Sequence, residues 1–309
     1  MGTLRAMRLP WLPEGRTVQV EGRGEFFIRL HRHEEPTAPV IVLLHGWTAS
    51  SDLQFFTAYE ALAKRFTFVG IDHRGHGRGL RSPDPFTLED AADDVAAIIR
   101  QLGVGPVVAV GYSMGGPVSM HLARRHPELV AGLVVEATGL EWSGTRRERL
   151  LWRFLPIVGS WLRSRGYRRY LNRGVPKVIG AGHALEPYVP WLVSEMSRND
   201  SFAMVDAGRA LSHYDARPWA STLNLPAGSL IMTRDRVVWP SKQRALAKEL
   251  NAVVRELPAD HLGALSDPVP FAALTVELID VVLAARQPTP TAGASPSSDA
   301  AWVASSSSS

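Results

Sequence analysis

The sequence predicts an α/β protein with a mostly parallel, doubly wound sheet and an inserted helical cap. Short apolar runs of strand length alternate with helical stretches, and this alternation stops near residue 141 and resumes near residue 221. Continuous apolar runs are typical of strands that are buried on both faces of a parallel sheet. Strands that alternate with helices indicate a sheet covered by helices on both sides.

The first half of the chain is predicted to begin with a hairpin and to continue with parallel strands. Two strand-like runs within residues 17–31, separated by a Gly-rich turn, predict an antiparallel hairpin at the sheet edge. Buried strands are predicted at 39–44, 66–72, 105–111 and 129–137. Helices are predicted between them at 52–65, 87–102 and 114–126, and Thr87 stands at the N-cap position of the second.

The strand pattern is interrupted from Glu141 to about Ala220. This stretch is rich in Arg, Trp and Pro and contains helical fragments, so we interpret it as a cap inserted into the core. The core resumes with strands at 228–234 and 251–257 and helices at 241–250 and 268–285. The predicted organisation is an N-terminal extension (1–16), a first core segment (17–140), the cap (141–220), a second core segment (221–286) and a disordered tail rich in Pro, Ala and Ser (287–309).

The composition excludes several kinds of site. The 309 residues contain no cysteine, which rules out disulfides, thiolate zinc sites and cysteine nucleophiles. No run reaches the roughly 18 to 20 apolar residues that a membrane span needs. The first residues are basic but lack the apolar stretch of a signal peptide, so we expect a cytoplasmic protein.

A serine between two glycines follows the predicted strand at 105–111. The stretch Gly111-Tyr-Ser113-Met-Gly115 has the G-x-S-x-G pattern, in which a sharp strand-to-helix turn presents the serine hydroxyl to a base. The alternative is a serine that merely forms a turn. Because the motif lies between a predicted strand and a predicted helix, we interpret Ser113 as a nucleophile.

A serine nucleophile also needs donors for the oxyanion that forms on the carbonyl oxygen. The backbone N–H of Met114, directly after the nucleophile, is one candidate donor. The backbone N–H of Trp47 is the other, because Gly46 allows the chain to come close after the first central strand. The alternative for His45-Gly46 is a strand-ending turn with a structural histidine.

Five motifs together resemble the α/β-hydrolase fold family over about residues 38–285. They are HGW at 45–47, DHRGHGRG at 72–79, GYSMGG at 111–116, TRDRVVWP at 233–240 and DH at 260–261. Within the family the chain is most similar to esterases, monoacylglycerol lipases and lysophospholipases, and it is also similar to carbon–carbon bond hydrolases. The resemblance to haloalkane dehalogenases and epoxide hydrolases stops at Ser113, because those members use aspartate there.

The resemblance implies the order nucleophile, acid, histidine along the chain. It places the base at His261, although Asp260 stands where the family often has glycine; a surface-loop histidine and His213 in the cap are the alternatives. It places the acid at Asp235, with an ordinary loop aspartate as the other interpretation. Glu136 stays open as an alternative acid, because some family members carry theirs on the preceding strand.

The motif at 72–79 allows two other interpretations. Asp72, His73 and His76 could bind a metal, and the glycines could form part of a dinucleotide fingerprint. However, GHGRG is not G-x-G-x-x-G, and no helix is expected to open there. We therefore expect neither a metal nor a cofactor.

The cap concentrates the basic residues of the chain. The segment from Arg146 to Lys177 contains ten Arg or Lys residues and a single acidic residue, Glu148. Apolar residues at near-helical spacing run through the same segment (Leu151, Phe154, Leu155, Val158, Trp161 and Leu162), with Pro156 expected to break or kink the helix. One interpretation is a lid packed over the site. The other is a basic amphipathic surface that contacts anionic membrane; nucleic acid is not expected, since no nucleic-acid motif accompanies the charges.

The sequence thus predicts a serine hydrolase that cleaves a carboxylic ester through an acyl-enzyme, with Ser113, His261 and Asp235 as a catalytic triad. A carbon–carbon bond hydrolase or a thioesterase with the same triad is the alternative. A non-catalytic binding protein on this fold is the alternative of another class.

Overall fold

An eight-stranded sheet runs through the centre of the protein, in the strand order β1-β2-β4-β3-β5-β6-β7-β8. The computed structural model describes residues 8–162, 164–179 and 183–285. The strands are β1 (Glu14–Val20), β2 (Gly24–His31), β3 (Val40–Leu44), β4 (Thr67–Ile71), β5 (Val107–Tyr112), β6 (Val130–Glu136), β7 (Ala227–Met232) and β8 (Val253–Leu257). Only β1 and β2 are antiparallel to their neighbours, and β3 to β8 pair in parallel.

The predicted hairpin and parallel strands are therefore present, with boundaries that differ from the predicted ones by up to three residues. β1 begins at Glu14, three residues earlier than expected, because its pairing with β2 extends to Glu14 opposite Leu30. The central strands β3 and β5 are buried along nearly their whole length, which explains their uninterrupted apolar sequences.

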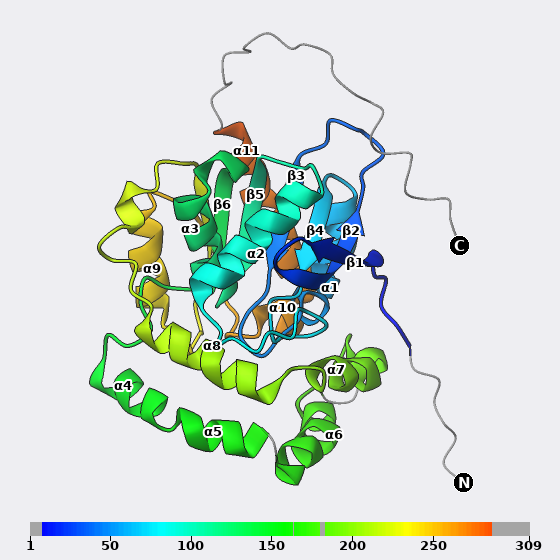
Figure 1. Ribbon diagram of the computed structural model, residues 1–309, viewed down its shortest axis with the longest axis vertical. Coiled ribbons are helices and arrows are strands. Elements are labelled where there is room, and N and C mark those ends of the chain that lie inside the picture. Colours follow the sequence, from blue (N-terminus) through cyan, green and yellow to red (C-terminus); the bar gives the residue numbers. More distant parts are fainter. Residues whose placement is uncertain (1–7, 163, 180–182, 286–309) are drawn as a thin grey trace.

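Helices cover both faces of the sheet (Figure 1). Helices α2 (Leu88–Gln101), α3 (Gly115–Arg125) and α9 (Pro240–Glu249) bury apolar side chains in one core layer. Helices α1 (Ser51–Ala63), α10 (Gly263–Ser266) and α11 (Pro268–Ala284) contribute to the other. The expected N-cap is present, since the Thr87 hydroxyl accepts a hydrogen bond of 3.0 Å from the Asp90 amide. This arrangement confirms the doubly wound α/β fold.

The segment between β6 and β7 consists of helices at one end of the sheet, along the lower edge of Figure 1. They are α4 (Arg146–Arg153), α5 (Leu155–Leu162), α6 (Arg165–Ile179), α7 (Val189–Met196) and α8 (Ser201–His213). The described residues also contain three short 3-10 turns: η1 (Pro127–Leu129), η2 (Glu186–Tyr188) and η3 (Ala220–Thr222).

The apolar stripe expected on the cap divides between two faces. Leu155 is buried, whereas Leu151, Phe154 and Trp161 are exposed, so these residues do not all lie on one face. The helix breaks at Phe154, between α4 and α5. Pro156 is the second residue of α5, where the backbone N–H has no partner within the helix, so proline costs no hydrogen bond there.

No helix in the described ranges is both long enough and apolar enough to cross a bilayer. The tail predicted at 287–309 lies outside the described residues, as do the first seven residues of the predicted N-terminal extension.

Candidate active site

Ser113 occupies the sharp turn between β5 and α3. Its φ of 52° lies in the left-handed region, which a residue with a side chain adopts only when its surroundings hold it there. The flanking glycines make the turn possible. A Cβ on Gly111 would overlap the carbonyl oxygen of Gly115, and a Cβ on Gly115 would overlap that of Leu44.

Two loops from the second half of the chain bring a histidine and an aspartate to this serine. The Ser113 hydroxyl lies 3.0 Å from Nε2 of His261, and Nδ1 of His261 lies 2.7 Å from Oδ2 of Asp235. Because a carboxylate only accepts hydrogen bonds, Nδ1 carries the proton and donates a hydrogen bond to Asp235. The lone pair of Nε2 then faces the serine hydroxyl, as a base requires.

Several hydrogen-bond donors fix the orientation of the Asp235 carboxylate. Its Oδ1 accepts hydrogen bonds from the amides of Val237 (2.7 Å) and Val238 (3.0 Å). Its Oδ2 also accepts a bond of 3.0 Å from Nε2 of Gln243 on α9. The sequence analysis missed Gln243. The signal that could have identified it is that Gln243 is a polar residue on the buried face of α9, which also carries Leu246.

A hydrogen bond to its backbone carbonyl also holds His261 in place. The phenol of Tyr112, the residue before the nucleophile, donates a hydrogen bond of 2.8 Å to the His261 carbonyl. Tyr112 is also a residue that the sequence analysis did not single out. Strand β5, which leads directly to Ser113, therefore also fixes the loop that carries His261.

The loop after β3 passes directly beside Ser113. A Cβ on Gly46 would lie 3.2 Å from the Cβ of Ser113. Nε2 of His45 accepts the His73 amide (3.0 Å), so Nδ1 carries the proton and donates to the Gly46 carbonyl (2.8 Å). In a trans peptide the C=O and N–H point in opposite directions, so this bond also sets the direction of the Trp47 amide. His45 is thus a buried structural residue, and burial lowers the pKa of its imidazole well below the usual value.

Cap residues hold the same loop from the other side. The indole N–H of Trp47 donates a hydrogen bond of 2.7 Å to the Met204 carbonyl on α8. The side-chain amide of Asn199 donates a bond of 2.7 Å to the carbonyl of Thr48, which has a φ of 63°. The other predicted donor, the amide of Met114, stands at the start of α3, next to Ser113.

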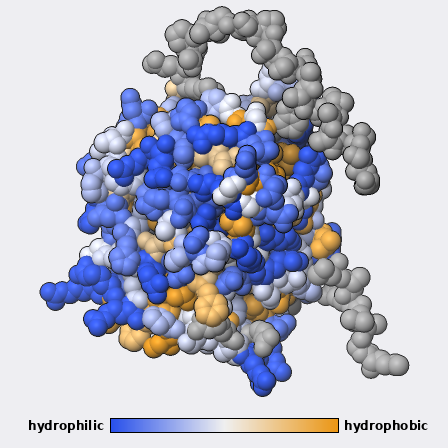
Figure 2. Space-filling view, in the orientation of Figure 1, coloured by the Kyte–Doolittle hydropathy of each residue, from blue (hydrophilic) through white to orange (hydrophobic). Residues whose placement is uncertain are grey.

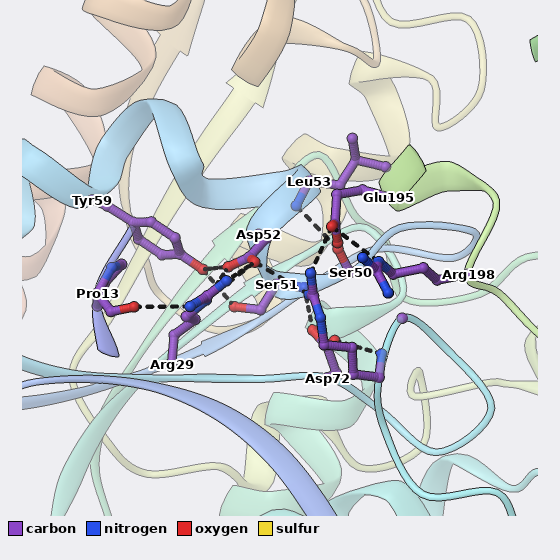
Figure 3. Close-up of polar contacts among 12 residues, drawn as sticks. Pro13, Arg29, Ser50, Ser51, Asp52, Leu53, Tyr59, Asp72, Glu195 and Arg198 are labelled. Atoms are coloured by element: carbon purple, nitrogen blue, oxygen red, sulfur yellow. Dashed lines mark hydrogen bonds and ion pairs between the residues drawn. The ribbon is translucent and has the colours of Figure 1, made fainter. Parts of the chain in front are cut away.

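A buried network of charges fixes the loops behind this site (Figure 3). Asp72 accepts hydrogen bonds of 2.8 Å from the amides of Ser51 and Arg78, and burial raises the pKa of its carboxyl to about 6. The guanidinium of Arg78 in turn bonds to Glu195 of α7 at 2.6 Å and to Asp52 of α1 at 3.3 Å. The core and the cap are therefore joined by ion pairs as well as by packing.

Asp72, His73 and His76, the residues considered for a metal, are all buried beside this network. Burial lowers the pKa of His73 to about 3 and that of His76 to about 4, so both imidazoles are neutral. In the described part of the chain no group of three or more His, Cys, Asp or Glu side chains is arranged to hold a metal ion. Gly77, at a φ of 49°, has no room for a Cβ beside the Asp72 carboxylate, which accounts for this glycine without a dinucleotide.

The side chains of the two alternative site residues have other partners. The carboxyl of Glu136 is fully buried and accepts a hydrogen bond of 2.6 Å from Thr275 on α11, and burial raises its pKa to about 8. His213 lies at the end of α8, where Nδ1 bonds to the Arg209 carbonyl of the same helix. The structure therefore brings Ser113, His261 and Asp235 together, and it does not place His213 in this group.

A cavity of about 350 Å³ opens above Ser113 and His261. The core contributes Trp47, Leu53 and Leu265 to its wall, and the cap contributes Tyr170, Val175 and Ile179 of α6. Most of these side chains are apolar. The cavity can therefore take an apolar group and hold it beside the serine hydroxyl.

Two characterised proteins are similar to part of this chain. The chain is 35% identical to 2-(acetamidomethylene)succinate hydrolase of Mesorhizobium japonicum over 35% of its length, and this match spans 38% of that enzyme. It is 41% identical to the bifunctional esterase/perhydrolase DCH of Acinetobacter calcoaceticus over 29% of its length, which is 33% of that protein. The chain thus matches between 33% and 38% of the length of these relatives.

A solved structure extends the likeness over most of the chain. The enol-lactonase of Burkholderia xenovorans LB400 superposes with a TM-score of 0.73 and 22% identity, covering 86% of this chain and all of that one (100%). A family model described as alpha/beta hydrolase fold matches residues 39–268. The resemblance inferred from the five motifs is confirmed, and the chain belongs to the alpha/beta hydrolase fold family.

Proposed function

We propose that this protein is a serine hydrolase that cleaves carboxylic esters with an apolar acyl group. The observation that carries the proposal is the chain of hydrogen bonds from Ser113 through His261 to Asp235, at the base of an apolar cavity. The name of the relative from Acinetobacter, an esterase/perhydrolase, supports ester chemistry. The names of two other similar proteins, a 2-(acetamidomethylene)succinate hydrolase and an enol-lactonase, indicate that the family hydrolyses other kinds of substrate as well.

The geometry accounts for each step of such a reaction. His261 takes the proton of the Ser113 hydroxyl while the serine oxygen attacks the ester carbonyl. The amides of Trp47 and Met114 stabilise the negative charge on the carbonyl oxygen. Asp235 keeps Nδ1 of His261 protonated and stabilises the imidazolium, which then gives its proton to the leaving alcohol.

The acyl-enzyme is released by the same groups. Water enters in place of the alcohol, His261 accepts one of its protons, and the hydroxide attacks the acyl carbonyl. The ester bond to Ser113 breaks, the serine recovers its proton from His261, and the carboxylic acid leaves. A cavity of about 350 Å³ is at the small end of ligand sites, so we expect acyl chains of short to medium length.

Hydrolysis of p-nitrophenyl esters of graded chain length tests the proposal. The wild type should show an optimum at short to medium chains, and Ser113→Ala should lower turnover at least about 10³-fold. Equal rates for the two proteins would end the mechanism. Turnover of a thioester or of a carbon–carbon bond substrate, without turnover of esters, would assign the triad to a different reaction. A protein that a fluorophosphonate does not label would be a binding protein.

A further inference from the structure

The outer side of the cap carries an apolar stripe that the core does not use. Leu150 and Phe154 lie four residues apart at the end of α4, and Ile157 and Trp161 lie four residues apart on α5, so each pair lies on one side of its own helix. Their exposed fractions are 55%, 50%, 64% and 44%. The opposite side of α5 packs inward: Leu155 is buried, and a Cβ on Gly208 of α8 would lie 2.8 Å from it. The packing of the cap onto the core therefore does not account for the outer stripe.

Basic side chains flank this stripe. Helix α4 exposes Arg146, Arg147, Arg149 and Arg153, and helix α6 exposes Arg165, Arg169, Arg173 and Lys177. The one acid in the sequence from 146 to 177 is Glu148, which turns to Lys242 of α9 in an ion pair of 2.5 Å. In Figure 2, apolar side chains gather along the lower edge of the molecule, and strongly hydrophilic ones project beside them. We call the four apolar residues and these eight cations the outer cap face.

The outer cap face is continuous with the cavity above Ser113. The ring centroids of Trp161 and Tyr170 lie 5.7 Å apart, and Tyr170 belongs to the wall of the cavity. Val237 and Leu262, at the same cavity, are 59% and 53% exposed, so its rim is apolar as well. An apolar molecule at the outer cap face would therefore lie beside the wall of this cavity.

We propose that the outer cap face docks on a bilayer that contains anionic phospholipid. Apolar and aromatic side chains of a helix that lies on a membrane insert at the level of the headgroups, and Arg and Lys around them bind lipid phosphates. Charge complementarity selects an anionic bilayer over a neutral one. An acidic protein or a nucleic acid would match the charges but would leave the exposed Phe154 and Ile157 without apolar partners.

Docking goes beyond the proposed function, because a protein can bind vesicles without turning over an ester. The experiment is co-sedimentation of full-length Ser113→Ala protein with vesicles of phosphatidylcholine alone and of phosphatidylcholine with 30% phosphatidylglycerol. We expect partitioning onto the anionic vesicles only. It should weaken when NaCl rises from 0.1 M to 1 M, which shortens the Debye length from about 10 Å to about 3 Å.

Two sets of substitutions separate the two parts of the surface. Phe154→Ser with Ile157→Ser should lower partitioning about five-fold or more, because it removes the groups that insert. Arg146→Gln with Arg147→Gln should lower it about 25-fold on anionic vesicles, at about five-fold for each cation. Val269→Ser is the matched control: Val269 is 79% exposed on α11, and its loss should leave partitioning unchanged.

The same substitutions are also made in the protein that keeps Ser113. The rate at which these variants hydrolyse a soluble ester reports whether they fold. Phe154→Ser with Ile157→Ser should retain the wild-type rate. Equal partitioning onto neutral and anionic vesicles would overturn the proposal, as would unchanged partitioning of both double variants. A dimer that forms without vesicles and dissociates in the Phe154→Ser, Ile157→Ser variant would also overturn it, since the face would then bind a second copy of the chain.

Discussion

Asn199 of the cap donates a hydrogen bond of 2.7 Å to the carbonyl of Thr48, in the loop that passes beside Ser113. Its Oδ1 accepts another, of 2.8 Å, from the amide of Gly77. Asn199→Asp keeps the acceptor and removes the donor. We expect kcat on a soluble ester to fall about 10-fold, because losing a hydrogen bond of roughly 1 kcal/mol loosens the loop that carries the Trp47 amide.

The KM should change less than two-fold, since Asn199 does not line the cavity. Asn251→Asp adds the same charge at an exposed turn before β8, and it should leave both constants unaltered. If KM rose while kcat stayed constant, Asn199 would act on substrate binding and not on the loop.

Substitution of the two acids distinguishes their roles. Asp235→Asn should lower kcat about 10⁴-fold, because an amide no longer fixes the protonated Nδ1 of His261. Glu136→Gln should retain most of the activity, because Glu136 contacts Thr275 on α11. Steady-state rates at several pH values check both expectations. A larger loss from Glu136→Gln than from Asp235→Asn would reverse the assignment of the acid.

The buried Glu136 carboxyl predicts how stability depends on pH. Its pKa is about 8 in the folded protein, against an ordinary value of 4.5. Stabilisation from the protonated carboxyl is therefore complete below about pH 4.5, and it is lost as the pH rises through 8. The loss is on the order of a few kcal/mol, at about 1.4 kcal/mol per pKa unit.

Thermal unfolding between pH 5.5 and 8.5 measures this loss. The Tm of the wild type should decrease relative to that of Glu136→Gln as the pH rises, because glutamine does not ionise. Parallel curves for the two proteins would show that the carboxyl does not keep its proton on folding.

The turn at Ser113 should be intolerant of a single methyl group. Gly115→Ala places a Cβ against the carbonyl oxygen of Leu44, and we expect it to destabilise the fold by about 3 kcal/mol, as overpacking does. Gly139→Ala is the control, because the nearest atom to its Cβ would be 3.4 Å away. Urea unfolding compares the two. If the two variants had equal free energies of unfolding, the backbone around Gly115 would be able to shift without loss of stability.

Much of the core could be predicted because its signals are local. A strand buried on both faces is an uninterrupted apolar run, as in β3 and β5, and the glycines at 111 and 115 mark a turn without side-chain room. The positions of His261 and Asp235 needed the family's chain order in addition. The cytoplasmic location and the domain boundaries stay predictions.

The remaining features depend on distances that the sequence does not contain. Gln243 and Asn199 are ordinary polar residues until the fold brings them to Asp235 and Thr48, which are 8 and 151 positions away along the chain. The division of the cap stripe was missed for a similar reason. Leu155 and Phe154 are both apolar, and only the packing on α8 decides which one turns inward.

The bonds from Trp47 to Met204 and from Asn199 to Thr48 have a consequence for exchanging caps between relatives. A chimera that takes the whole segment between β6 and β7 from another enzyme would replace Met204 and Asn199, so it could lose both bonds and weaken the chemistry while it altered the choice of substrate. A graft that retains α8 and the residues from Asn199 onward, and that replaces only α4 to α6, would change selectivity without disturbing the amide donors.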